Sequence, residues 1–142
     1  GRRGRAVPAA EPPDNRRVKL VLDAGALIGI DRNDRRVAGL LELGRRGGAE
    51  LVTSTPVVAQ AWRDGARQAN LARHMPMIDH REVDLDEAKA AGELLAAAGT
   101  ADVVDALLAR LAMPGDQVLT SDPGDLRALL LARTVAATVV IV

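Results

Sequence analysis

The chain has 142 residues, the size of one ordinary domain, and 48% of them are hydrophobic, so it can bury a core and is not wholly disordered. One Trp and no Phe, Tyr or Cys argue against a protein that stacks RNA bases on an aromatic sheet, and they exclude disulfides, thiolate zinc sites and cysteine nucleophiles. The formal net charge is zero, but residues 1–17 hold five Arg against two acidic residues, and the remainder is correspondingly acidic.

The N-terminal segment has a different composition from the rest of the chain. Residues 1–17 are rich in Arg, Pro, Gly and Ala and have no periodicity, so we predict a disordered basic tail followed by one domain over 18–142. The segment lacks the apolar stretch of a secretory signal, and no run approaches the ~18–20 apolar residues of a membrane helix. We therefore expect a cytoplasmic protein without membrane contact, and the Arg-rich and Ala-rich composition suggests a bacterial source.

Strands and helices are expected to alternate in the first half of the domain. The apolar run over 18–22 contains a single Lys, ends at Asp23 and predicts a buried strand that leads into a turn and helix. Asp34 is a helix cap, and Ser54 or Thr55 is another. The remaining expected elements here are a helix over 35–46, a strand over 51–53, a helix that breaks near 64–65 and a short helix over 66–75.

The second half of the domain continues this alternation. A helix over 86–98 ends at Gly99, and Thr100 is expected to cap the next helix, which runs to about Met113. The other expected elements are a weak strand over 78–83, a strand over 117–120, a helix opened by 121–123 and a last strand over 138–142. Alternating strands and helices predict an α/β fold with a central parallel sheet flanked by helices.

Acidic residues stand where open α/β sheets place their ligand sites, beyond the carboxyl ends of the strands. Asp23 directly follows the first strand, and Asp122 follows the strand over 117–120. Asp102 and Asp105 are three residues apart, which places both on one helix face. The simpler interpretation is that Asp102 and Asp105 are solvated charges near a helix N-terminus. In that interpretation Asp23 caps the turn that follows it, and Asp122 caps the helix that starts at Pro123.

Together these carboxylates predict a cation site. Carboxylates ~4 Å apart repel each other by roughly 4 kcal/mol at an effective dielectric constant near 20, so a chain that gathers them commonly holds a cation between them. Oxygen ligands, with no Cys and only two His in the chain, favour Mg²⁺ or Mn²⁺ over Zn²⁺. Such ions commonly serve phosphoryl chemistry.

Four segments of the chain resemble the PIN-domain ribonucleases, and in particular the VapC-type toxins of bacterial toxin–antitoxin pairs. The resemblance covers 18–142 and implies a central parallel sheet flanked by helices, with an acidic cluster that binds Mg²⁺ or Mn²⁺ and hydrolyses RNA. It also implies a cognate VapB-type antitoxin protein and a homodimer. The four segments are VLDAGALI at 21–28, TPVVAQAWRDG at 55–65, ADVVDALLARLA at 101–112 and VLTSDPGDL at 118–126.

The resemblance also assigns roles to individual residues. It implies that Asp23, Asp105 and Asp122 are catalytic and bind the metal, and that Asp102 joins them as a metal ligand. The implied reaction is attack of water on an RNA phosphodiester, which leaves a 5′-phosphate and a 3′-hydroxyl. The residues expected to support these four are Gln60, Thr120, Ser121 and Asp125.

Gln60 departs from the family pattern, in which a Glu usually stands on this helix. An amide brings no charge to a metal, so we keep the alternative of a catalytically weak or inactive PIN-like module that binds RNA or a protein. Gln60, Arg63 and Arg67 have helical spacing, so Arg63 and Arg67 are candidate contacts to RNA phosphates if the helix continues through Asp64, and solvated arginines otherwise.

The remaining residues of types that could bind a ligand or take part in catalysis fit no site. His74 and His80 match no ligand pattern, and we expect Trp62 to pack in the core rather than to stack on a base. A phosphoacceptor receiver domain is disfavoured because it needs a Lys near the end of a late strand, whereas the two lysines are Lys19 and Lys89.

Overall fold

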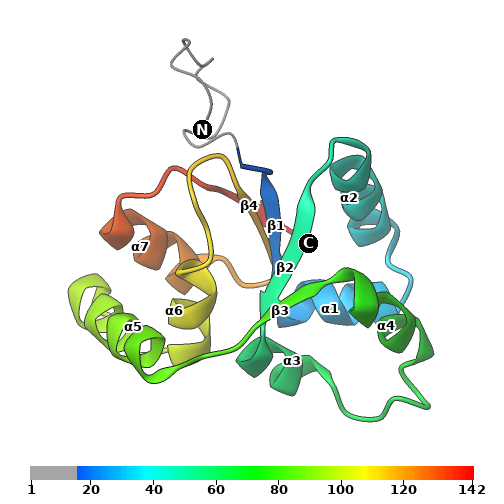
Figure 1. Ribbon diagram of the computed structural model, residues 1–142, viewed down its shortest axis with the longest axis horizontal. Coiled ribbons are helices and arrows are strands. Elements are labelled where there is room, and N and C mark those ends of the chain that lie inside the picture. Colours follow the sequence, from blue (N-terminus) through cyan, green and yellow to red (C-terminus); the bar gives the residue numbers. More distant parts are fainter. Residues whose placement is uncertain (1–15) are drawn as a thin grey trace.

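The computed structural model describes residues 16–142, and its centre is a five-stranded sheet in the order β3-β2-β1-β4-β5 (Figure 1). Every neighbouring pair of strands is parallel, so the predicted α/β fold is confirmed, and it is consistent with a single PIN-like domain. The strands are β1 (Lys19–Leu22), β2 (Glu50–Ser54), β3 (Asp79–Arg81), β4 (Gln117–Thr120) and β5 (Thr138–Ile141).

Helices cover both faces of the sheet. Figure 1 shows α5, α6 and α7 on one side of the strands and α1, α2 and α4 on the other, with α3 below the end of β2. The helices are α1 (Ala24–Asp31), α2 (Arg35–Arg46), α3 (Thr55–Ala61), α4 (Ala69–His74), α5 (Leu85–Ala98), α6 (Val103–Ala109) and α7 (Gly124–Arg133), with a 3₁₀ turn, η1 (Met75–Met77), before β3.

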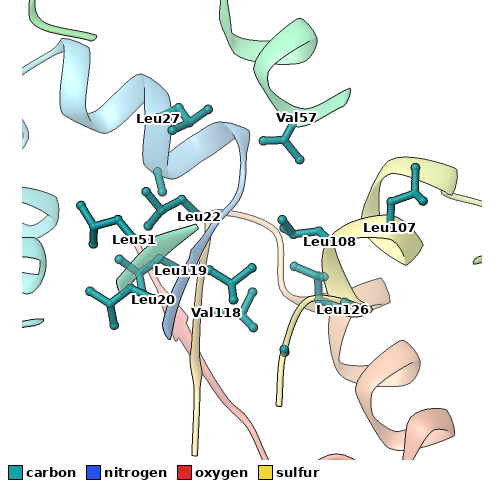
Figure 2. Close-up of a cluster of buried hydrophobic side chains, with 14 of the residues drawn as sticks. Leu20, Leu22, Leu27, Leu51, Val57, Leu107, Leu108, Val118, Leu119 and Leu126 are labelled. Carbon is teal, nitrogen blue, oxygen red and sulfur yellow. The ribbon is translucent and has the colours of Figure 1, made fainter. Parts of the chain in front are cut away.

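The core is aliphatic and lies on both faces of the sheet. β1 is buried along its whole length because it sits between β2 and β4 with helices on either side. Figure 2 shows Leu27 of α1 on one side of the strands and Leu108 and Leu126, from α6 and α7, on the other. All three side chains are fully buried, so the two helix layers pack directly on the sheet.

Several element boundaries differ from the prediction. α6 begins after Asp102 rather than Thr100 and ends at Ala109 rather than near Met113. The cause is the Asp102 side chain, which accepts the hydrogen bond that caps the helix, whereas the Thr100 hydroxyl is buried without a hydrogen-bond partner among the described residues. The short helix predicted over 66–75 begins only at Ala69, and the strand predicted over 78–83 is confined to β3.

The predicted tail lies mostly outside the described residues, which begin at residue 16. Arg16 contacts the domain through Asp116, with Nη1 3.0 Å from Oδ1. The Arg17 Nε donates to the carbonyl oxygen of Gly48 at 2.8 Å. These last two residues of the predicted tail are therefore bonded to the domain that starts at Val18.

Among residues 16–142, none of the helices has the length and apolar character needed to cross a bilayer.

Candidate metal centre

Asp23 stands at the carboxyl end of β1 and has two roles in the structure. Its Oδ1 accepts a hydrogen bond from the Ala26 N–H at 2.9 Å, which caps α1. Its Oδ2 accepts from the Ser121 N–H at 3.3 Å, which ties the end of β1 to the segment that follows β4. Asp23 is therefore a structural cap, as the simpler interpretation supposed, and it also lies at the acidic edge of the sheet.

Gly25 permits the close approach of α1 to this segment. A Cβ atom on Gly25 would overlap the side chain of Ser121 and would lie 3.3 Å from Asp23 Oδ1. Ser121 is exposed, so its hydroxyl lies at the surface beside the first turn of α1. The glycine in the segment VLDAGALI is thus explained by local packing at the edge that carries the carboxylates.

Asp122 follows β4 and does not cap a helix. α7 begins at Gly124 after Pro123, and no side chain caps it. The Asp122 N–H donates to the buried Thr120 Oγ1 at 3.0 Å, which fixes the turn, and the Asp122 side chain remains exposed. The interpretation of Asp122 as a helix cap is therefore wrong.

Asp102 and Asp105 lie side by side at the start of α6. Asp102 Oδ1 accepts a hydrogen bond from the Asp105 N–H at 3.0 Å, and Asp105 lies in the first turn of the helix. Asp125 lies in the first turn of α7. One carboxylate oxygen from each of these three residues lies within 4.8 Å of the others, an arrangement that could hold a metal ion.

Asp105 is the electrostatic centre of the site. Its pKa is raised from 3.8 to about 6, first by burial and then by the negative charges around it. Four carboxylates contribute to this rise, so five aspartates from three parts of the chain interact here. We call them the aspartate cluster: Asp23, Asp102, Asp105, Asp122 and Asp125.

The group of carboxylates that could hold a metal differs from the expected ligand set by one residue gained and two lost. Asp125, expected only in a supporting role, lies with Asp102 and Asp105 in the group that could hold a metal. Asp23 and Asp122, expected as ligands, are outside that group but close enough to raise the pKa of Asp105. The spacing of three between Asp122 and Asp125, like that between Asp102 and Asp105, was the available signal for Asp125.

The residues expected around an RNA strand are dispersed. α3 ends at Ala61, so Arg63 and Arg67 lie beyond the helix and the helical spacing with Gln60 does not apply. Gln60 is exposed and lines a hollow of about 300 Å³ in which no member of the aspartate cluster takes part. The other residues that line this hollow are Ile28, Asp31, Arg32, Ala61, Arg63 and Gln68.

The remaining candidates have local roles. The Arg63 guanidinium donates to the carbonyl oxygens of Ala59 and Trp62 at 2.9 and 2.7 Å, which covers the end of α3. Arg67 lies 3.9 Å from Asp64 in an exposed ion pair. Trp62 is half-buried and packs against the core, as expected, but it also lines a surface groove.

A second charged centre lies at the opposite end of β4 and was not anticipated from the sequence. Asp116 is fully buried and 2.9 Å from the Lys19 ammonium, and it also accepts hydrogen bonds from the N–H groups of Lys19 and Met113, both at 2.8 Å. Burial alone would raise its pKa, but these donors, together with Arg16, lower the pKa below its ordinary value. The signal in the sequence was the lone Lys in a strand that is otherwise apolar.

The donor chemistry of the aspartate cluster suits a cation. All the donors that converge are carboxylate oxygens. Burial and then their mutual repulsion raise the pKa of Asp105, so a positive charge between them would be stabilised. Comparison of the chain with protein-family models and with curated proteins finds no match, so the argument for function rests on this geometry.

Proposed function

We propose that the protein is a metal-dependent endoribonuclease of the PIN type and the toxin component of a toxin–antitoxin pair. The observation that supports this most is the convergence of four further aspartates on Asp105 at the carboxyl edge of a parallel sheet. This edge is where open α/β sheets bind ligands. Carboxylates that repel each other are costly to the fold unless they bind a cation, so their presence favours a catalytic role.

The donor set favours Mg²⁺ or Mn²⁺, with Asp102, Asp105 and Asp125 as the direct ligands. A divalent ion bound there supplies a Lewis acid that activates water and offsets charge on the phosphate. Asp23 and Asp122 add negative charge around the ligands, and Asp23 also holds the Ser121 backbone next to the site. Thr120 fixes the turn that carries Asp122 through its hydroxyl.

The reaction we propose is hydrolysis of an RNA phosphodiester. The oxygen of a water molecule forms a bond to phosphorus, and the bond from phosphorus to the ribose 3′-oxygen breaks. The proton lost by the water reaches the departing 3′-oxygen by way of the surrounding carboxylates and solvent. The products are a 5′-phosphate and a 3′-hydroxyl.

A cleavage assay tests this proposal. We expect the protein to cut a labelled single-stranded RNA with Mn²⁺ or Mg²⁺ and to be inactive with EDTA, because the proposed reaction depends on a bound ion to activate the water. Asp105→Asn should abolish cleavage, whereas Asp86→Asn, at an exposed position in the first turn of α5, should leave it intact. Full cleavage in EDTA, or a fully active Asp105→Asn protein, would contradict the proposal.

The proposed toxin role implies protein partners and a cellular compartment. We propose a bacterial cytoplasmic protein that forms a homodimer and is inhibited by a cognate VapB-type antitoxin. The test is expression in a bacterial host: growth should stop, and co-expression of the protein encoded by a small overlapping upstream reading frame should restore it. The Asp105→Asn variant, which retains the surface of the protein, should not stop growth.

Gln60 favours a second candidate function, a PIN-like module that binds RNA or a protein without cutting RNA. The amide contributes no charge, and the hollow that it lines contains Arg32 and Arg63 but none of the aspartate cluster. Calorimetric titration with Mn²⁺ together with the cleavage assay separates the two functions. RNA binding with neither Mn²⁺ binding nor cleavage would establish the module.

A further inference from the structure

A shallow apolar groove lies between α3 and β3, and no member of the aspartate cluster lines it. It has a volume of about 380 Å³ and is open to solvent. It holds Trp62, the single aromatic residue of the chain. The groove is lined by Thr55, Val58, Trp62, Met75 and His80.

The loop after α3 holds the indole ring of Trp62 in place. A Cβ atom on Gly65 would lie 2.9 Å from the ring atom Cζ2, so the bare backbone of Gly65 packs against the indole. Gln68 closes this loop, because its side chain accepts from the Arg63 and Asp64 N–H groups at 2.6 and 3.0 Å. It also donates to the Ala61 carbonyl oxygen at 2.9 Å. The ring is therefore preorganised and does not depend on a partner for its position.

The register of the sheet places this groove near the proposed catalytic edge. Val21 of β1 pairs with Val52 of β2, so Asp23 and Ser54 occupy neighbouring positions two residues further along. Thr55 follows Ser54 directly, and His80 of β3 pairs with Thr53. Adjacent strands are ~4.8 Å apart, so the groove begins one strand away from Asp23. A short stretch of an extended polymer can reach both.

The groove lies in the more basic part of the chain. Residues 16–81, the basic half of the chain, contain twelve Lys and Arg against seven Asp and Glu, a net charge of +5. Residues 82–142, the acidic half, contain four Lys and Arg against ten Asp and Glu, a net charge of −6. All the residues that line the groove belong to the basic half. Arg63, next to Trp62, is exposed, and its guanidinium donates to two carbonyl oxygens rather than to a carboxylate.

We propose that this groove binds one unpaired nucleobase of an RNA strand, stacked on the Trp62 ring, while the strand continues toward the aspartate cluster. The proposal rests on the proposed function, since it takes RNA as the ligand. An apolar groove with a fixed aromatic ring suits a flat base, and the neighbouring Arg63 guanidinium suits a phosphate beside that base. The groove selects single-stranded RNA, because a paired base cannot enter it.

The single Trp makes the groove directly observable by fluorescence. The metal-free protein in EDTA, at low salt, is titrated with a mixed-sequence single-stranded RNA octamer. We expect saturable quenching of the Trp62 emission. Inorganic polyphosphate, which has the charge without the bases, and a blunt RNA duplex should cause little quenching. The absence of metal keeps this readout independent of cleavage.

The position of the bound base is tested with variants, whose affinity for a fluorescein-labelled RNA octamer is measured by fluorescence anisotropy. Trp62→Leu should weaken binding about tenfold, the loss expected for one stacked base. His80→Glu alters an exposed residue of the groove and should weaken binding while it leaves the fold and the Trp62 signal intact. The matched control is Leu131→Glu, the same change at a position of α7 that is 80% exposed, and its affinity should stay within twofold.

The outcomes separate the groove from the catalytic proposal. Metal-dependent cleavage without quenching, together with unchanged RNA affinity in Trp62→Leu and His80→Glu, would overturn the proposal of a base-binding groove. The proposal of a nuclease would be unaffected. Quenching by the octamer without any cleavage would support the groove and overturn the nuclease. Emission that changes with protein concentration alone, together with a dimer in sedimentation, would assign the groove to a second copy of the chain and overturn the proposal.

Discussion

β4 connects two acidic centres with opposite electrostatics. Asp116 precedes the strand and is surrounded by donors and cations, so its pKa is lowered although it is fully buried. Asp105 lies beyond the other end of the strand, where burial and four further carboxylates raise its pKa to about 6. An aspartate therefore stabilises the fold at one end of the sheet, as Asp116 does, and destabilises it at the other end, as Asp105 does. The destabilising centre is the better candidate for a ligand site, because a bound cation would offset the repulsion there.

The two centres also respond to pH with opposite signs. The lowered pKa of Asp116 means that its contribution to stability is present above the unfolded pKa and is lost as the pH falls through the folded pKa. The raised pKa of Asp105 means that the folded state binds a proton more tightly than the unfolded state. Stability from this residue is therefore lost as the pH rises from about 4 to about 6.

The largest effect is expected from Asp116→Asn. The variant leaves the Lys19 ammonium buried without its carboxylate, so the free energy of unfolding should fall by about 3–5 kcal/mol in urea denaturation at pH 7. Replacement of Lys19 by Met in the same chain should recover part of the loss, because the buried charge is then gone. The control is Asp122→Asn at the other end of β4, which is exposed and should not destabilise the protein. Equal losses at both ends would remove the contrast between the centres.

A smaller effect is expected from added Mn²⁺. At a concentration one hundred times its dissociation constant, a ligand that binds only the folded state raises the free energy of unfolding by about 2.7 kcal/mol. Asp125→Asn should lose most of this gain because Asp125 belongs to the group that could hold the ion. A variant at Asp116 should start from lower stability and keep the full gain. Urea denaturation of the parent protein and of the two variants, with and without Mn²⁺, measures these gains. An undiminished gain in Asp125→Asn would contradict the proposed ligand set.

The smallest effect is expected from Asp105→Asn in the metal-free protein. The change removes a charge that is disfavoured by burial and by repulsion within the aspartate cluster. It should raise the free energy of unfolding at pH 7.5 by about 1–2 kcal/mol, a range reduced for solvent screening of this half-buried group. The gain should shrink as the pH falls through 6 and vanish near pH 4. Thermal melts across this range provide the measurement. A loss of stability at pH 7.5 would mean that Asp105 is an ordinary solvated residue near a helix N-terminus.

The fold was largely predictable because the strands are short apolar runs bounded by turn residues. The runs over 117–120 and 138–142 were placed within one residue of β4 and β5. The errors lie where two polar residues compete for one role, as Thr100 and Asp102 do for the cap of α6. Local sequence does not decide such a competition, since the outcome depends on which side chain reaches the free N–H groups.

The site was predicted in outline and not in detail. Asp23 and Asp122 follow from the rule that ligands meet the carboxyl ends of strands, whereas Asp102 and Asp105 follow from their spacing of three on one helix and from the family resemblance. The spacing of three from Asp122 singles out Asp125, but its place beside Asp102 and Asp105 depends on how α7 packs against α6, a tertiary contact that local sequence does not show. The pairing of Lys19 with Asp116 joins residues 97 positions apart, so the sequence could show that the lysine needs a partner but not which one.

The division of the chain into a basic and an acidic half has a consequence for the protein in solution. Its net charge is zero, so overall repulsion between molecules is weak, yet the separated charges attract the opposite half of a neighbour. Salt screens this attraction, with a Debye length of ~30 Å at 0.01 M and ~8 Å at 0.15 M. Solubility should therefore be lowest in dilute buffer near pH 7 and should rise as salt is added, the behaviour known as salting-in.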